Sequence, residues 1–176
     1  TSAPFILSLN PDARPRPDFI SRLIAAYREH EQLRPGAITG RLLRPRRGNE
    51  RLIDATGMRL TPTWRHLDCE SGEIDRDQRL DTDRVFGATG AASLFVRQAL
   101  DDVALDGEFF ASEFHSYRED AELCFRLRER GWEVIYDSAA VAVHARTNLP
   151  ERRRQMTKAI NYHSLKNRYL LRIYHQ

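Results

Sequence analysis

Short apolar runs alternate with segments of helical periodicity along the chain, and this alternation constrains the fold more than any other feature of the sequence. The strand-like runs are residues 3–9, 37–43, 132–137 and 139–144. Apolar residues recur at helical spacing from Pro17 to about His30 and from about Arg118 to Arg130, which predicts two helices with one buried side each. Strands that alternate with helices favour an α/β class, in which helices flank a sheet.

Two further segments have a different pattern. From Arg44 to Asp83, polar and charged residues interrupt short apolar pieces, and we expect hairpin-like strands and a long surface loop there. A long basic helix is expected from Glu151 onward. Its candidate apolar residues are Ile160, Leu165, Tyr169, Leu170 and Ile173. We therefore divide the chain into an α/β part, residues 1–150, and a C-terminal helix, residues 151–176.

The composition excludes several classes of protein. With 41% hydrophobic and 30% charged residues among 176, the chain can bury the core of one domain. Its apolar runs are far shorter than the roughly 20 residues of a membrane span, and we expect neither a transmembrane helix nor a signal peptide. The two cysteines, Cys69 and Cys124, can build neither a disulfide framework nor a multi-cysteine zinc site, which favours a reducing compartment.

The basic residues are nearly all of one kind, since 26 of the 28 are arginines. Arginine suits phosphate recognition because its guanidinium fork matches phosphate oxygens, but genomic base composition produces the same bias. The arginines and lysines cluster at 44–47, at 152–154 and along 166–172. The net charge of +3 is too small to predict nucleic-acid binding by itself.

Two acidic features and a histidine are candidates for a site. Asp12 follows the first strand-like run, where a carboxylate can hold a cation such as Mg²⁺, although Asn-Pro-Asp is also an ordinary turn sequence. Glu119 and Asp120 begin a helix, where they complement the helix dipole or where one of them acts as a general base. His144 ends a strand-like run and could share a metal ion with Asp12.

A small-residue segment, GATGAAS at 87–93, is the fourth candidate feature. Small residues let the backbone approach a ligand closely, and they also permit tight packing without any ligand. The segment lacks the lysine of a P-loop, so a nucleotide-binding loop of that type is excluded.

In this order, the motifs resemble those of family 2 glycosyltransferases. The matching elements are a strand ending in NPD, the glycine-alanine segment, FF followed by ED-x-x-L-C-x-R-x-x-x-x-GW, a strand ending in AVAVH, and Lys166-Asn167-Arg168, which looks like the family's (R/K)NR element. The similarity extends from Phe5 to Tyr174, and the nearest branch is the rhamnosyltransferase-like bacterial enzymes of cell-surface polysaccharide synthesis. The family usually has aspartate where Glu122 stands.

The resemblance implies a GT-A fold, a Rossmann-like mixed sheet flanked by helices, and inverting transfer of a sugar from a nucleotide-sugar donor to a saccharide or lipid-linked acceptor. It implies that Asp12 and His144 bind Mg²⁺ or Mn²⁺, with Asn10 at the first position of the acidic motif. Asp120 matches the catalytic base, and Glu119 is the alternative carboxylate. The pocket for donor sugar and acceptor would be lined by Gly87, Ala88 and Thr89.

The same resemblance suggests that the chain is part of a longer protein. The nucleotide-binding half that normally precedes the NPD strand is missing, and the chain begins at Thr1 and ends at Gln176 inside patterned segments. We therefore expect both ends to be cuts, and the fragment could be inactive alone. By similarity we expect a cytoplasmic location, at the inner face of the membrane.

Two other interpretations stay open. The chain could be a non-catalytic arginine-rich domain that binds nucleic acid or an anionic membrane surface, although its intermixed acidic residues and the lack of a nucleic-acid motif argue against nucleic acid. It could also be a degenerate glycosyltransferase retained for assembly. The C-terminal helix has two interpretations of its own: a core-packed helix with a solvated basic side, or a helix that contacts anionic lipid.

Overall fold

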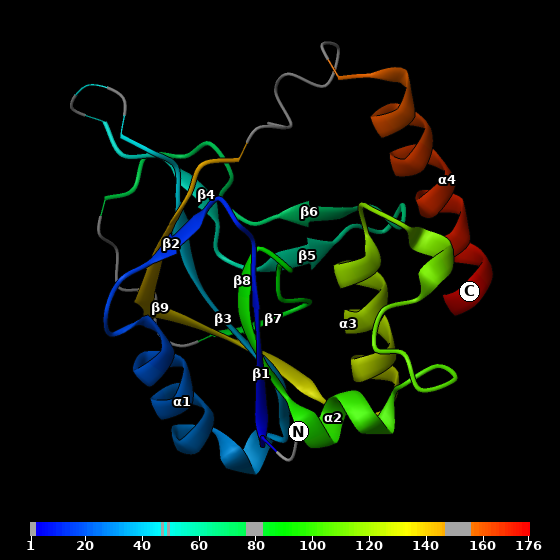
Figure 1. Ribbon diagram of the computed structural model, residues 1–176, viewed down its shortest axis with the longest axis horizontal. Helices are drawn as coiled ribbons and strands as arrows, with labels where there is room; N and C mark the ends of the chain where they lie inside the picture. Colours follow the sequence, from blue (N-terminus) through cyan, green and yellow to red (C-terminus); the bar gives the residue numbers. More distant parts are fainter. Residues whose placement is uncertain (1–2, 47, 49, 77–82, 147–155) are drawn as a thin grey trace.

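The computed structural model describes residues 3–46, 48, 50–76, 83–146 and 156–176 (Figure 1). The strands are β1 (Phe5–Leu9), β2 (Ala13–Pro15), β3 (Pro35–Leu43), β4 (Ile53–Ala55), β5 (Met58–Leu60), β6 (His66–Asp68), β7 (Asp83–Val85), β8 (Ala92–Val96) and β9 (Glu133–His144). The α-helices are α1 (Phe19–Glu29), α2 (Arg97–Asp102), α3 (Glu119–Glu129) and α4 (Lys158–His175), and two 3₁₀ turns are η1 (Glu31–Leu33) and η2 (Ser112–Phe114). Strands and helices alternate along the chain, which confirms the α/β class.

A mixed seven-stranded sheet forms the centre of the molecule. Its order is β1-β8-β3-β9-β2, with β4 paired to β3 and β7 paired to β9. The central strands β3 and β9 run parallel, whereas every other described pairing in this sheet is antiparallel. All nine residues of β3 are buried, as expected for a central strand that is covered on both faces. Strands β5 and β6 form a separate hairpin, as predicted for the segment after Arg44.

Helix α1 covers the sheet through a narrow apolar stripe, whereas α3 is buried on all sides. In α1, the buried residues Phe19, Leu23 and Ala26 recur at helical spacing and contact β3 and β9, which confirms the helix predicted from Pro17 to about His30. In α3, the run from Ala121 to Leu127 is buried on all sides, because the helix lies between the sheet and α4 (Figure 1). Buried apolar residues of this size each contribute roughly 1.5–3 kcal/mol relative to exposure.

Strand β9 corrects the prediction of two short strands separated by a turn. It continues through Asp137 and Ser138, and its pairing with β3 shifts from Gly40↔Asp137 to Arg41↔Val141. The turn-forming residues therefore form a bulge within one long strand. Gly40 is required opposite this bulge, because a Cβ there would lie 2.4 Å from the Ala140 carbonyl oxygen.

Two smaller differences have local causes. Strand β1 is an edge strand and is half-buried, whereas its apolar sequence predicted a buried strand. Helix α2 was not expected, because it starts directly after β8 and its N-cap, Val96, makes no side-chain cap. A helix without a capping residue carries no start signal in the sequence.

Helix α4 packs at the edge of the molecule, beside α3 (Figure 1). It begins at Lys158, where the Thr157 hydroxyl accepts a hydrogen bond from the Ile160 amide at 3.3 Å. The predicted boundary at residue 150 and the basic cluster 152–154 lie outside the described residues. In the described part of the chain, no helix has the length and hydropathy of a membrane span.

Candidate active site

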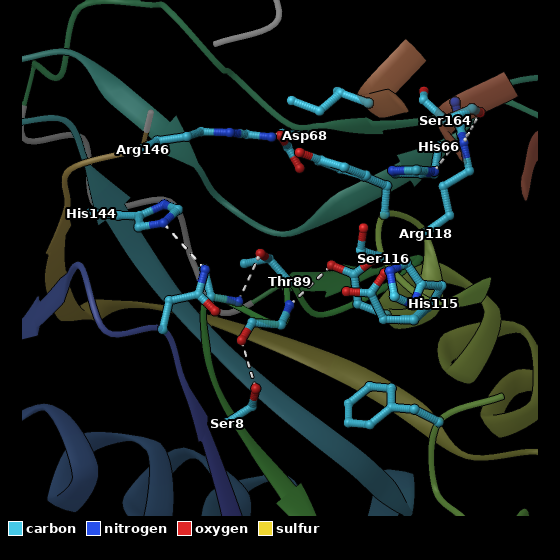
Figure 2. A pocket seen from close by; sticks show the side chains of 18 of the residues that line it. Ser8, His66, Asp68, Thr89, His115, Ser116, Arg118, His144, Arg146 and Ser164 are labelled. Atoms are coloured by element: carbon cyan, nitrogen blue, oxygen red, sulfur yellow. Dashed lines mark hydrogen bonds and ion pairs between the residues drawn. The ribbon is translucent and has the colours of Figure 1, made fainter. Parts of the chain in front are cut away.

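A cleft of about 920 Å³ joins the ends of several elements (Figure 2). It is lined by the turn after β1, the buried strand β4, the β5–β6 hairpin, residues 89–91, residues 110–120, the end of β9 and one side of α4. Figure 2 shows His144 and Arg146 on one side of the cleft, and His115, Arg118 and Ser164 on the other. Residues that are far apart in the sequence, from Ser8 to Ser164, therefore line the same cleft.

Asp12 and His144 meet on one side of this cleft, as predicted. Strand β2 pairs with the end of β9 so that Ala13 lies opposite His144, and the Asp12 Oδ1 atom is 3.3 Å from His144 Nε2. The Asn10 amide nitrogen lies 3.5 Å from the same ring nitrogen. The pairing of β2 with β9 thus joins side chains that are far apart in the sequence.

Asp54 is a residue of this site that the sequence did not reveal. It lies on β4, its side chain is 1% exposed, and its Oδ2 atom accepts a hydrogen bond from His144 Nδ1 at 2.7 Å. This bond places the proton of a neutral ring on Nδ1 and leaves Nε2 free to accept, facing Asp12. A charged residue inside the short apolar run Leu52–Ala55 was the available signal, since such a residue is seldom buried without a partner.

Arg146 continues the network to the β5–β6 hairpin. Its guanidinium donates to Asp68 Oδ2 at 2.5 Å and to Asp54 Oδ1 at 3.5 Å. Burial disfavours the charge on Arg146, but the two carboxylates outweigh burial and raise its pKa. The guanidinium therefore stays charged and fixes the hairpin against the end of β9.

Asp120 is held at the start of α3 by two backbone amides. Its Oδ2 atom accepts from Gly90 N at 3.0 Å, and its Oδ1 atom accepts from Ala121 N at 2.8 Å. These bonds fix the orientation of the carboxylate at the cleft wall, where it also lines the cavity. A carboxylate oxygen can accept more than one hydrogen bond, so Asp120 can also accept a hydrogen bond from a group bound in the cleft.

Glu119 lines the same cleft in a different environment. Burial, followed by the negative charge of Asp120, raises the pKa of Glu119 from its ordinary value of 4.5 to about 7. Its Oε2 atom is buried and hydrogen bonds to no group in the described part of the protein. A carboxyl whose pKa is near neutrality can both accept and release a proton at physiological pH.

The small-residue segment lines the cleft only at its middle, residues 89–91. Thr89 and Gly90 line the cleft, and Ser8 Oγ donates to the Gly90 carbonyl at 2.6 Å. Gly87 and Ala88 lie behind it, where a Cβ on Gly87 would be 2.9 Å from the Met58 side chain and Ala88 is fully buried. Gly87 and Ala88 therefore serve tight packing, and the prediction that they line the pocket is corrected.

The segment before Glu119 has an unusual backbone conformation. His115, Tyr117 and Arg118 all have positive φ angles, of 57°, 68° and 77°. Non-glycine residues seldom adopt this region, and such positions concentrate at functional sites where the surrounding structure holds them. The lining of the cleft directly before the two carboxylates is therefore built from strained backbone.

Asn167 on α4 holds this segment in place. Its side-chain amide donates to the carbonyls of Phe114, Ser116 and Tyr117 at 2.7, 2.9 and 2.6 Å, and the residue is fully buried. The (R/K)NR resemblance was the signal for Asn167, but its contacts could not be predicted from the sequence because they join positions about 50 residues apart.

Arg118 joins three elements at the far end of the cleft. Its Nη1 donates to His66 Nδ1 at 2.8 Å, and its Nε donates to the Ser164 carbonyl at 3.0 Å. Burial, and then the charge of Arg118, lowers the pKa of His66 to about 4. His66 is therefore neutral at physiological pH and can accept this bond, which ties the β5–β6 hairpin to α3 and α4.

Glu122, where the family usually has aspartate, faces away from the cleft. Its carboxylate accepts two hydrogen bonds from Arg126, at 2.8 and 2.7 Å, and its side chain is 1% exposed. Burial would raise the pKa of Glu122, but hydrogen bonds from His175 and Arg126 outweigh burial and lower it. Glu122 is therefore a buried, paired carboxylate of the core.

The side chains of Asp12 and His144 could supply two of the ligands that a divalent cation needs. Within the described ranges, no group of three or more His, Cys, Asp or Glu side chains could hold a metal ion. The hydrogen bond to Asp54 leaves His144 Nε2 available, as in other sites where a carboxylate orients a metal-binding histidine. Further oxygen ligands would have to come from water or a bound diphosphate.

Comparison with known proteins identifies the family of the chain. A search of curated protein sequences found no match. The family model described as glycosyltransferase-like family 2 matches residues 12–161, which contain β2 to β9, the cleft carboxylates, His144 and the start of α4. The mixed sheet flanked by helices is consistent with the GT-A-like fold of that family. The chain therefore belongs to glycosyltransferase-like family 2.

Proposed function

We propose that the protein transfers a hexosyl unit from a nucleotide-sugar donor to a hydroxyl group of a saccharide or lipid-linked acceptor, with inversion at the anomeric carbon. One observation carries the proposal: the cleft places the Asp12–His144 pair and the Glu119–Asp120 pair on its walls. The first pair suits a diphosphate with its cation, and the second suits a hydroxyl that must lose a proton. Family membership supports glycosyl transfer in general.

Asp120 is the proposed general base. The acceptor hydroxyl gives its proton to Asp120 while its oxygen forms a bond to the anomeric carbon. The bond between that carbon and the diphosphate oxygen breaks, and the nucleoside diphosphate leaves with the electron pair. This single displacement needs no enzymic nucleophile. The amides of Gly90 and Ala121 fix the carboxylate, so that its orientation costs little in the transition state.

Asp12, His144 and Asn10 form the proposed donor end. Asp12 and His144 would hold Mg²⁺ or Mn²⁺ together with the donor, and the cation would neutralise charge on the departing diphosphate. Asp54 keeps His144 in the required tautomer through its bond to Nδ1. Arg65, exposed at the rim of the cleft, can add a charged hydrogen bond to a phosphate oxygen.

The sequence resemblance supports a narrower assignment. We propose a rhamnosyltransferase-like enzyme that builds bacterial cell-surface polysaccharide, working in the cytoplasm at the inner face of the membrane. This assignment rests on the succession of motifs from NPD to Lys166-Asn167-Arg168.

Substitution of Asp120 tests the proposal in the natural polypeptide that carries this sequence. Asp120→Asn keeps the shape of the side chain but cannot accept the proton, so turnover should fall by a factor on the order of a thousand. Donor affinity, measured by calorimetry with Mn²⁺ present, should hardly change. The matched control is Asp101→Asn on α2, which removes an exposed carboxylate outside the cleft and should leave turnover unchanged. Equal turnover in Asp120→Asn and the parent would exclude Asp120 as the base.

A further inference from the structure

Helix α4 presents a continuous apolar stripe to solvent. Its members are Tyr162, Leu165, Tyr169 and Ile173, with exposed fractions of 63%, 51%, 58% and 74%. Their spacing of three, four and four residues puts them on one face of the helix. Figure 1 shows α4 at the outer edge of the molecule, outside α3, so this face is directed away from the protein.

The inner face of α4 is less apolar than the outer face. The buried residues of the helix are Leu171 and Asn167, and Asn167 is held by hydrogen bonds rather than by apolar contact. A helix that packs on a core normally buries its largest apolar side chains. Three of the predicted apolar residues, Leu165, Tyr169 and Ile173, are exposed, so the core-packed interpretation of the helix does not account for them.

The charge of α4 is entirely positive. The helix contains Lys158, Lys166, Arg168 and Arg172 and no acidic residue. Lys166 is four residues after Tyr162, and Arg172 is three residues after Tyr169, so one cation borders the stripe on each side. An apolar centre with cationic borders is the pattern of a helix that lies in a membrane interface.

We propose that the outer face of α4 binds an anionic lipid surface. Leu165 and Ile173 would enter the boundary between headgroups and acyl chains, and tyrosine rings would lie at the headgroup level. Lys158 is exposed and would contact lipid phosphates directly. Lys166 and Arg172 also donate to the carbonyls of Glu113 and Thr63 and would reach lipid phosphates with their remaining N–H groups. A second copy of the chain fits less well, because two α4 helices of the same charge repel each other. Nucleic acid also fits less well, since aliphatic Leu165 and Ile173 gain nothing from a phosphate backbone.

Docking through this face would bring the cleft to the lipid surface. Ile160 and Ser164 lie on the other side of the same helix and line the cleft. A helix is about 10–12 Å across with its side chains, so one helix diameter would separate the bound lipid from the cleft. The membrane proposal stands on α4 alone and does not depend on glycosyl transfer.

Vesicle co-sedimentation of the natural polypeptide that carries this sequence tests the proposal directly. Binding is measured with phosphatidylcholine vesicles and with equimolar phosphatidylcholine and phosphatidylglycerol. We expect the anionic vesicles to bind the protein at least about tenfold more strongly, and we expect this difference to shrink as the salt concentration rises.

The stripe variant, Leu165→Gln with Ile173→Gln, should lower binding to anionic vesicles about tenfold. Glutamine is a good helix former, and circular dichroism verifies that the helix content is kept.

The control variant replaces two other exposed aliphatic side chains, outside α4. Ile20 on α1 and Ile74 are 44% and 49% exposed, and Ile20→Gln with Ile74→Gln should leave vesicle binding unchanged. Equal binding by neutral and anionic vesicles, or equal loss in the stripe and control variants, would overturn the proposal. So would a dimer in sedimentation velocity that the stripe variant converts to monomer, or RNA binding that the stripe variant abolishes while vesicle binding is absent.

Discussion

Glu119 and Asp120 are adjacent in the sequence, but their carboxylates lie in different surroundings. Asp120 accepts two backbone hydrogen bonds, whereas Glu119 Oε2 is buried without a hydrogen bond among the described residues. The negative charge of Asp120 further disfavours a negative charge on Glu119. Glu119 is therefore partly protonated near neutral pH.

The raised pKa of Glu119 predicts a pH dependence of stability. Because the folded-state pKa, about 7, exceeds the ordinary value of 4.5, the folded protein binds the proton more tightly than the unfolded chain. The contribution of Glu119 to stability is fully present below about pH 4.5 and is lost as the pH rises through 7. Glu119→Gln should remove this fall and raise the free energy of unfolding at pH 8 by about 2 kcal/mol, since one pKa unit corresponds to 1.4 kcal/mol and solvent reduces the effect at a partly exposed group.

Urea unfolding at several pH values measures this effect. At pH 5 the parent and Glu119→Gln should differ little, and the difference should grow toward pH 8. Glu108→Gln, at an exposed carboxylate outside the cleft, is the matched control and should follow the parent at every pH. Parallel pH profiles for the parent and Glu119→Gln would contradict the assigned environment of Glu119.

At the residue scale, candidate side chains could be predicted where residue type and position in a strand-like run together suggest a site. Asp12 and His144 each follow a strand-like run, and the predicted juxtaposition is present at 3.3 Å. Asp54 was not predicted, because its role depends on the 2.7 Å bond to a histidine 90 positions away. Gly87 and Ala88 were assigned to the pocket because small residues permit both ligand approach and packing, and the sequence cannot distinguish the two.

At the element scale, the fold depends on how α4 is joined to the start of α3. Asn167 bonds the carbonyls of the strained segment before Glu119, and Leu171 packs in a small apolar cluster with Phe114 and Phe125. At the C-terminal end of α4, the His175 ring stacks on Phe125 with centroids 4.7 Å apart. These contacts position the carboxylates from outside the cleft.

Substitution of Asn167 should therefore weaken both stability and turnover. Asn167→Leu has a similar volume but removes the amide that donates to the carbonyls of Phe114, Ser116 and Tyr117; the Phe114 carbonyl keeps its bond from the Ser116 amide. We expect the free energy of unfolding to fall by about 2–3 kcal/mol, because each buried unsatisfied polar group costs about 1–3 kcal/mol and part of the segment can reach water. Amide hydrogen exchange should increase in residues 114–118, and turnover should fall about tenfold as the carboxylates lose their fixed position.

The control for this variant lies on the same helix. Asn161→Leu removes a single side-chain bond, to the Met156 carbonyl at 3.3 Å, and should cost no more than about 1 kcal/mol. Unchanged hydrogen exchange at 114–118 in Asn167→Leu would show that the amide does not hold this segment.

Element boundaries were predictable where local chemistry sets them. Helix α1 has a regular apolar stripe, and α3 begins with three acidic residues in its first turn, which favour a helix N-terminus. The bulge in β9 was not predictable, because Asp137 and Ser138 form turns locally and only pairing with β3 keeps them in a strand. Long-range pairing here overrides local preference.

At the scale of the whole molecule, the cleft lies where segments from the first and last parts of the chain come together. The end of β9 lies on one side of the cleft, and α3 and α4 lie on the other (Figure 2). The β5–β6 hairpin contacts both sides, through Arg146 and Arg118. The α/β class followed from alternation alone, whereas the mixed strand order required the structure. A donor bound at Asp12 and His144 would thus face an acceptor beside Asp120.

The stereochemistry of the product tests this account most directly. The natural polypeptide that carries this sequence is incubated with nucleotide sugars, Mn²⁺ and a saccharide or lipid-linked acceptor, and the anomeric proton of the product is measured by nuclear magnetic resonance. Because a single displacement assisted by Asp120 attacks the face opposite the leaving diphosphate, the account predicts a new glycosidic bond of inverted configuration. Retention of the donor's configuration, or no sugar transfer from any donor, would contradict it.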